Sequence, residues 1–258
     1  MQNILLHMAY DGTHFEGYQA QQGRRTVAGV LGEALDTMTG RKTRLIAAGR
    51  TDSGVHATGQ CANFLTHLNM PAGAFAKRLN ALLPDDLAII SSEAVSPQFH
   101  ARFADHWTTY RYLVENGVLY PQYRHLCFHY DFALDWAAMQ QAAALFLGEH
   151  DVSAFAMYTQ TDTTRRMLRD VTLEREGSRM AFTFTGNGFL RRQVRMMVGA
   201  LLSVGRGEVS ERQVARALAQ GSDHPLFFAA PPQGLTLVRV DYVEPVGVER
   251  GDPKEVNR

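Results

Sequence analysis

Hydrophobic residues repeat along the chain with two different periods, which predicts a mixture of helices and strands. A helical period with one buried face is found at residues 26–39, 71–83, 136–147, 189–204 and 211–220. Short apolar or alternating runs, typical of strands, are found at residues 4–10, 44–48, 60–65, 87–95, 107–115, 169–175, 179–185 and 234–243. Strands that are interrupted by helices and that form hairpin-like pairs favour an α/β or α+β sheet fold.

Residues with strong positional preferences mark several of the predicted helix ends. Thr26 is placed to cap the first helix and Gly40 to end it. Pro71 suits the first helical position of the second helix, where its missing N–H costs no hydrogen bond. Ser210 and Gln213 form the pattern of a capping box at the start of the last helix.

The two halves of the chain share one order of predicted elements: a strand, a helix and a pair of strands. The irregular stretch 96–105, which contains Pro97, separates them. We therefore expect an N-terminal α/β half at residues 1–104 and a C-terminal α/β half at residues 105–245. Residues 246–258 hold proline, glycine and charged side chains and are expected to form a frayed tail.

The charge of the chain is balanced overall but unevenly distributed. The 258 residues include 26 basic and 26 acidic ones, and 45% are hydrophobic, enough for a sizeable core. An anionic partner must therefore bind a local basic patch. Basic residues cluster at 24–25, 41–44, 77–78, 165–169 and 191–195. Several clusters lie beside aromatic residues, a mixture suited to phosphate contacts and base stacking, although each cluster alone is equally consistent with a solvated face.

Cysteine usage and hydropathy favour an intracellular protein. Cys61 and Cys127 lie far apart with no Cys-x-x-Cys pair, so neither a zinc site nor a disulfide framework is indicated. The longest apolar stretch, residues 196–204, has about half of the ~20 residues needed to span a membrane. The N-terminus lacks the features of a signal peptide. We expect a cytoplasmic protein with no bound metal and no membrane segment.

The segment Gly49–Gln60 is the strongest candidate for a site, because it places an Arg, an Asp and a His among three glycines. In an extended segment, Arg50 and Asp52 lie on the same face. A nearby guanidinium would keep the Asp52 carboxylate ionised and available as a nucleophile or base. A salt-bridged turn explains the same pattern equally well. His56 could transfer protons, but a hydrogen bond to the backbone is the preferred interpretation.

Other chemistries fit this segment poorly. It matches neither the dinucleotide-binding fingerprint nor the P-loop. Ser53 does not lie in a nucleophile-elbow sequence. A second candidate residue, Arg195, lies at the border of the apolar stripe of the helix predicted at 189–204, which also carries Arg191 and Arg192. A border arginine can turn towards a sheet, so Arg195 is a candidate partner for Asp52.

Taken together, these motifs resemble the tRNA pseudouridine synthase A family. The central match is Gly49–Ala57, and further matches follow in order over about residues 3 to 243: Tyr10–Gln19, Phe99–Phe103, Tyr110–Tyr112, Gly188–Gly199 and Gly234–Tyr242. Arg191 and Arg192 stand where histidine is expected in close relatives. This departure concerns contacts with RNA and leaves Asp52 unaffected.

The resemblance implies a fold, an activity and a set of site residues. The implied fold is two similar halves that form a mostly antiparallel central sheet flanked by helices, with a cleft between them. The implied activity is the cofactor-free isomerisation of uridine to pseudouridine at positions 38, 39 and 40 of the tRNA anticodon stem-loop by a homodimer. Asp52 would be the catalytic nucleophile, Arg195 its partner, and Arg50 a residue that positions the flipped nucleotide. Tyr110 would stack on the target base and Leu235 would line the pocket.

Two other functions remain open at this point. An RNA-binding module without chemistry would use the basic and aromatic clusters, but it would have no use for a carboxylate facing a phosphate chain. A hydrolase or nucleotide-binding enzyme would use the glycine-rich segment. The residues also leave open whether Asp52 would attack the sugar or the base.

Overall fold

The computed structural model describes residues 1–157, 163–222, 224 and 226–243. The predicted frayed tail at residues 246–258 lies outside the described residues.

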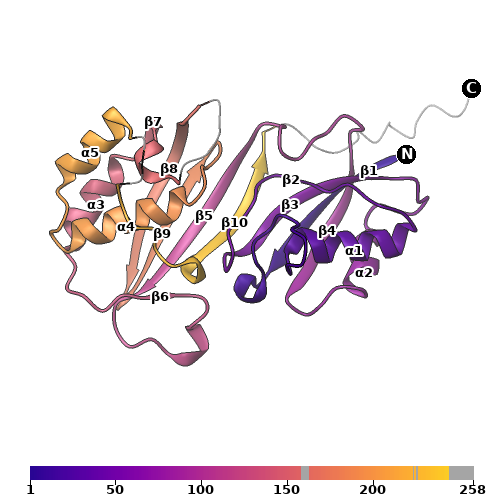
Figure 1. Ribbon diagram of the computed structural model, residues 1–258, viewed down its shortest axis with the longest axis horizontal. Coiled ribbons are helices and arrows are strands. Elements are labelled where there is room, and N and C mark those ends of the chain that lie inside the picture. The colour runs from indigo at the N-terminus through magenta and orange to yellow at the C-terminus, as the bar shows by residue number, and fades with distance from the viewer. Residues whose placement is uncertain (158–162, 223, 225, 244–258) are drawn as a thin grey trace, which may run out of the picture.

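A single mixed sheet runs through the whole molecule (Figure 1). Its main path has the order β4-β1-β3-β10-β5-β9-β8-β7, while β2 pairs with β3 and β6 with β5. The strands are β1 Gln2–Tyr10, β2 Ile46–Ala47, β3 His56–Thr66, β4 Leu87–Val95, β5 His106–Glu115, β6 Phe128–His129, β7 Gly148–Asp151, β8 Arg165–Glu176, β9 Arg179–Gly186 and β10 Leu235–Tyr242. Among the described strands only the pairs β10–β3 and β5–β6 are parallel, so the sheet is mostly antiparallel, as expected.

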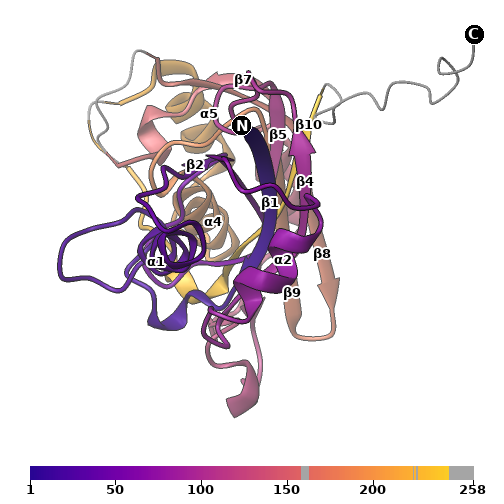
Figure 2. The ribbon, with the colours of Figure 1, turned by 90° about the vertical axis from the view of Figure 1, so that its right-hand side faces the viewer.

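Helices flank this sheet, and Figure 2 shows α1, α4 and α5 on the same side of it. The α-helices are α1 Val27–Thr39, α2 Ala74–Asn80, α3 Trp136–Ala144, α4 Gln193–Gly205 and α5 Glu211–Gln220. Short 3-10 turns are η1 Gly12–His14, η2 Pro121–Tyr123, η3 Ser153–Phe155 and η4 Pro232–Gly234. The mixture of elements confirms the predicted α/β (α+β) class.

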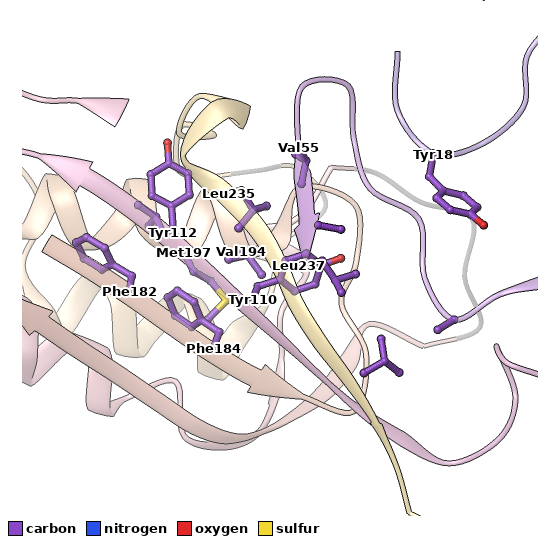
Figure 3. Packing of buried hydrophobic residues seen from close by; sticks show 14 of the residues in the cluster. Tyr18, Val55, Tyr110, Tyr112, Phe182, Phe184, Val194, Met197, Leu235 and Leu237 are labelled. Carbon is purple, nitrogen blue, oxygen red and sulfur yellow. The ribbon is translucent and has the colours of Figure 1, made fainter. Parts of the chain in front are cut away.

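The core lies between the sheet and the helices. In the C-terminal half, aromatic and aliphatic side chains from β5, β9, β10 and α4 meet in one layer (Figure 3): Tyr110, Tyr112, Phe182, Phe184, Val194, Met197, Leu235 and Leu237. The strand register explains this layer, because residues that are paired across the sheet point to the same face.

Several predicted ends agree with the structure. The Thr26 side chain accepts a hydrogen bond from the N–H of Gly29 at the start of α1, and Gly40 ends that helix with a left-handed φ of 72°. The capping box of Ser210 and Gln213 opens α5. The strand predicted at 87–95 matches β4 residue for residue.

Three other predicted ends are wrong. Helix α4 begins at Gln193, four residues after the predicted start, because Arg192 has a left-handed φ of 61°. Arg191 and Arg192 therefore precede the helix that was expected to carry them. Helix α2 begins at Ala74 and not at Pro71. Strand β3 begins at His56, so the glycine-rich loop is shorter than predicted.

Strand β10 joins the two predicted halves. It pairs in parallel with β3 and antiparallel with β5. Gly59 of β3 permits the close approach, since a Cβ there would lie 2.2 Å from the carbonyl oxygen of Val238. The loop before β3 and the turn before β10 are thereby brought together at the junction of the halves.

Candidate active site

Asp52 lies in the loop between β2 and β3, and the segment after β1 holds this loop in place. The Tyr10 hydroxyl is 2.8 Å from the buried hydroxyl of Thr51. The N–H of Tyr18 donates to the carbonyl of Thr51, and the N–H of Gly54 donates to the carbonyl of Phe15. Asp52 is therefore flanked on both sides by residues that are fixed to the same segment.

Two glycines of that segment are required by close contact with the loop. A Cβ on Gly12 would lie 2.0 Å from the carbonyl oxygen of Val55. Gly17 has a φ of +88°, and a Cβ there would lie 3.0 Å from the carbonyl oxygen of Thr51. The glycines in the Tyr10–Gln19 motif thus allow two stretches of backbone to pack directly against each other.

The Asp52 carboxylate is paired with Arg195 across the junction of the halves. Arg195 Nη1 lies 3.0 Å from Asp52 Oδ2, and Arg195 Nε donates to the carbonyl oxygen of Ala230 at 2.6 Å. The side chain of Arg195 is 10% exposed and that of Asp52 is 26% exposed. A nearly buried guanidinium, itself held by a backbone carbonyl, fixes a carboxylate that remains accessible to a ligand.

This contact is the one the sequence suggested, although the environment of Arg195 differs from the expectation. Arg195 was placed at the border of an apolar stripe, whereas every residue of α4 is buried. The segment Phe228–Ala230, just before η4, passes over the helix so closely that a Cβ on Gly199 would lie 2.0 Å from the carbonyl oxygen of Phe228. The same segment supplies the Ala230 carbonyl that binds Arg195.

Arg50 does not take part in this ion pair. Its side chain is exposed, and it has no hydrogen bond or ion pair with any residue that the structure describes. The expectation that Arg50 fixes the Asp52 carboxylate is therefore wrong for this structure, because Arg195 occupies that position. An exposed guanidinium without a protein partner is available to a ligand.

Tyr110 and Leu235 come from neighbouring strands beside this pair. Tyr110 of β5 is paired with Leu237, and Leu235 is paired with Tyr112. Tyr110 is 8% exposed, and its ring meets the edge of Phe189 at 5.2 Å between centroids. Burial, followed by the electrostatic effects of the neighbouring Tyr10 and Asp52, raises the pKa of Tyr110, so its phenol is neutral at physiological pH. Leu235 is buried directly after η4.

His56 is buried at the start of β3 and binds backbone groups through both ring nitrogens. Nδ1 lies 3.0 Å from the N–H of Gly12, and Nε2 lies 2.7 Å from the carbonyl oxygen of His125. The preferred interpretation of His56 as a residue that binds the backbone is thus confirmed. The contact with His125 could not be predicted, because the acceptor is a backbone carbonyl oxygen.

The predicted basic clusters differ in how they are paired. Arg24, Arg25 and Lys42 bind Glu16, Asp86 and Asp36 respectively. Within the described ranges, Arg191 and Arg192 have no ion-pair partner, and they precede the helix that carries Arg195. These two guanidinium groups, unlike those of Arg24 and Arg25, therefore have no carboxylate partner among the described residues.

No group of three or more His, Cys, Asp or Glu side chains in the described part of the chain could hold a metal ion. In the same part of the chain, none of the helices has both the length and the hydropathy needed to cross a membrane.

Comparison with known proteins decides the family. A model of tRNA pseudouridine synthases matches residues 7–104 and 142–243. The chain belongs to the tRNA pseudouridine synthase family. The tRNA pseudouridine synthase A of Acetivibrio thermocellus is 40% identical over 245 residues, which is 94% of this chain and 100% of that protein. The tRNA pseudouridine synthase A of Citrifermentans bemidjiense is 43% identical and covers 95% of this chain and 99% of its own length.

One solved structure shows a distant likeness. A chain from the crystal structure of a Cbf5-Nop10-Gar1 complex aligns with 80% of this chain and with 55% of its own length. The sequence identity is 13% and the TM-score is 0.33.

In this member of the pseudouridine synthase family, the Gly49–Ala57 and Gly188–Gly199 motifs meet in the ion pair of Asp52 and Arg195.

Proposed function

We propose that this chain isomerises uridine to pseudouridine at positions 38, 39 and 40 of the anticodon stem-loop of tRNA, with Asp52 as the catalytic carboxylate. The observation that carries the proposal is the contact between Asp52 and Arg195, which joins two family motifs at 3.0 Å across the junction of the halves. The names of the relatives support tRNA as the substrate.

The reaction needs a carboxylate and no cofactor. The bond between N1 of the base and C1′ of the ribose breaks, the base rotates, and a bond forms between C5 and C1′. The proton on C5 is lost to solvent and N1 gains one, so the product is an isomer of the substrate. Asp52 can form a bond to C1′ as the base departs, or add to the base ring; both routes use one accessible, ionised carboxylate. Glycosidases, by contrast, use two carboxylates and a water.

The proposed substrate-binding roles follow from the surroundings of Asp52. A uridine in a stem must leave the helix to reach the carboxylate, at a cost of a few kcal/mol. Arg50, which is exposed and has no described protein partner, would help to position the flipped nucleotide. Tyr110 would stack on the target base, and Leu235 would line the space that receives it.

We propose a homodimer in the cytoplasm, in which one tRNA touches both subunits. The predicted halves, residues 1–104 and 105–245, would each contribute a wall of the binding site, the first with Asp52 and Arg50, the second with Arg195, Tyr110 and Leu235.

A substitution of Asp52 tests the activity directly. Asp52→Asn should abolish tritium release from tRNA that carries C5-labelled uridine, while tRNA affinity in a filter-binding assay changes little. Asp85→Asn, an exposed carboxylate without an ion pair among the described residues, is the matched control and should keep full activity. Retained turnover in Asp52→Asn would refute the catalytic role.

Mapping of pseudouridine separates the enzyme from a pure binding module. Transfer RNA from cells that lack the enzyme should gain pseudouridine at positions 38 to 40 when the purified protein is added. Binding without any gain would favour the module, and modification at other positions would correct the substrate.

A further inference from the structure

His56 connects three segments that surround the catalytic loop. It follows Asp52 by four residues in the chain, its side chain is 5% exposed, and it belongs to the first half. Its Nδ1 meets the N–H of Gly12, and its Nε2 meets the carbonyl oxygen of His125 in the second half. One ring therefore spans the junction of the halves next to Asp52.

The two contacts fix how the ring carries its proton. The N–H of Gly12 needs an acceptor, so Nδ1 is unprotonated, and Nε2–H donates to the carbonyl of His125. Asp11 Oδ1 lies 3.1 Å from Nδ1, but it accepts hydrogen bonds from the N–H and hydroxyl of Thr13. Partial burial alone would raise the pKa of Asp11, but these hydrogen bonds lower it overall. The ring thus uses each nitrogen for a different segment.

The partner of Nε2 belongs to a projecting segment that we call the arm, residues 116–135. Figure 1 shows the arm, which includes β6, projecting beyond the end of the sheet. Its base is fixed: Asn116 Nδ2 donates to the carbonyl oxygens of Tyr130 and Phe132, and the buried Cys127 anchors its interior. The family model matches the chain on both sides of residues 105–141 and leaves the arm out.

The outer surface of the arm suits contact with RNA. Four large apolar side chains are exposed along the arm: Val118 (78%), Tyr120 (59%), Phe132 (47%) and Leu126 (42%). Arg124 and His125 are also exposed. Aromatic rings beside basic side chains bind unstacked bases and phosphates. Since the contact with His56 holds the arm beside the Asp52 loop, the RNA that reaches Asp52 is the occupant the site favours.

We propose that His56 is a positioning residue with two separable roles: Nδ1 holds the segment that clamps the catalytic loop, and Nε2 holds the arm in place as an RNA-binding surface. The inference rests on the proposed function and deepens it. Loss of the Nδ1 contact loosens the support of Asp52 and slows the reaction. Loss of the Nε2 contact releases the arm and weakens the binding of tRNA.

Two isosteric variants separate these roles. Asn places an oxygen near the position of Nδ1, so His56→Asn keeps the Gly12 contact and loses the His125 contact. Gln places a nitrogen near the position of Nε2, so His56→Gln keeps the His125 contact and loses the Gly12 contact. Because each substitution removes one hydrogen bond, we expect effects of about two- to tenfold. His56→Asn should raise KM and the tRNA Kd at unchanged kcat. His56→Gln should lower kcat at unchanged KM.

Two controls distinguish positioning from general damage. His7 also binds through both ring nitrogens, to Cys61 and Glu93, and lies on β1 away from the Asp52 loop. His7→Asn and His7→Gln should therefore leave kcat and KM unchanged. Tyr120→Ser, on the arm surface, should weaken tRNA binding like His56→Asn, and the double variant should be less than additive. The single variant Tyr120→Ser also tests the arm without altering the buried His56 ring.

Each outcome decides the question. Equal changes in both His56 variants, no change in either, or strict additivity with Tyr120→Ser would overturn the inference. The tRNA Kd is measured by filter binding without turnover, so the arm can be tested even if the proposed chemistry fails. Conversely, an inactive Asp52→Asn with no split between the His56 variants would leave the proposed function standing and remove only the role of His56.

Discussion

Replacement of Arg195 by Met should lower kcat/KM by about two orders of magnitude. The substitution removes two contacts, to Asp52 Oδ2 at 3.0 Å and to the carbonyl of Ala230 at 2.6 Å. Removal of one preorganised charged or hydrogen-bonding group from an active site costs about 2.7–4 kcal/mol of transition-state stabilisation. The Asp52 side chain is 26% exposed, so water replaces part of the interaction, and we expect about 2–3 kcal/mol. At about 1.4 kcal/mol for each tenfold, this gives about 30- to 160-fold.

The conservative variant sharpens this test. Arg195→Lys keeps the positive charge, but a single ammonium cannot hold both Asp52 and Ala230 as the planar guanidinium does, so a smaller loss of about tenfold is expected. The assay is the single-turnover rate of tritium release, with tRNA Kd measured in parallel. Arg216→Met, on the exposed face of α5, is the control and should behave like the unaltered protein. A folded Arg195→Met variant within threefold of the original rate would refute the view that Arg195 orients the catalytic carboxylate.

Two further predictions concern the fold around the site. Gly12→Ala puts a Cβ 2.0 Å from the carbonyl oxygen of Val55 and should lower the free energy of unfolding, measured by urea titration, by at least the ~1–3 kcal/mol typical of an overpacked core. The control Gly32→Ala, which has open space around the new Cβ, should be neutral or stabilising in the same titration. Burial raises the pKa of the Cys61 thiol to about 12, because the folded state favours the neutral thiol. The contribution of Cys61 to the free energy of unfolding is therefore fully present below the ordinary thiol pKa near 9 and is lost as the pH rises towards 12. Urea titrations at pH 8 and pH 10.5 should therefore show a steeper loss of stability in the original protein than in Cys61→Ala; equal losses would contradict the assignment.

Local patterns predicted the elements whose ends depend on local chemistry. The helix that follows Thr26 begins with a side-chain cap and ends at a left-handed glycine, both of which are sequence signals. The strand at residues 87–95 is partly buried and bounded by turns, so its length could be predicted. The pairing of Asp52 with Arg195 could be suggested because an arginine at the edge of an apolar stripe needs an anionic partner.

An unusual backbone conformation and two long-range contacts account for what was not predicted. The start of α4 depends on the left-handed conformation of Arg192, which no propensity favours for that residue type. Arg50 seemed the natural partner of Asp52 because it is two residues away, but Arg195 reaches the carboxylate through space. The carbonyl of His125, which binds His56, is a backbone group and therefore leaves no trace in the side-chain pattern.

The central position of β10 has a consequence for synthesis on the ribosome. Strand β3 leaves the ribosome early together with its partners β1 and β2, but β10, which pairs with the start of β3, is made near the end of translation. Until residues 235–242 emerge, the start of β3 at His56 and Ala57 presents an open strand edge that can pair with other chains. The first half cannot be completed as an independent folding unit, although domains commonly fold in the order in which they are made. Nascent chains arrested before residue 235 should therefore remain sensitive to protease around β3, and the catalytic loop should become ordered only when the last strand is inserted.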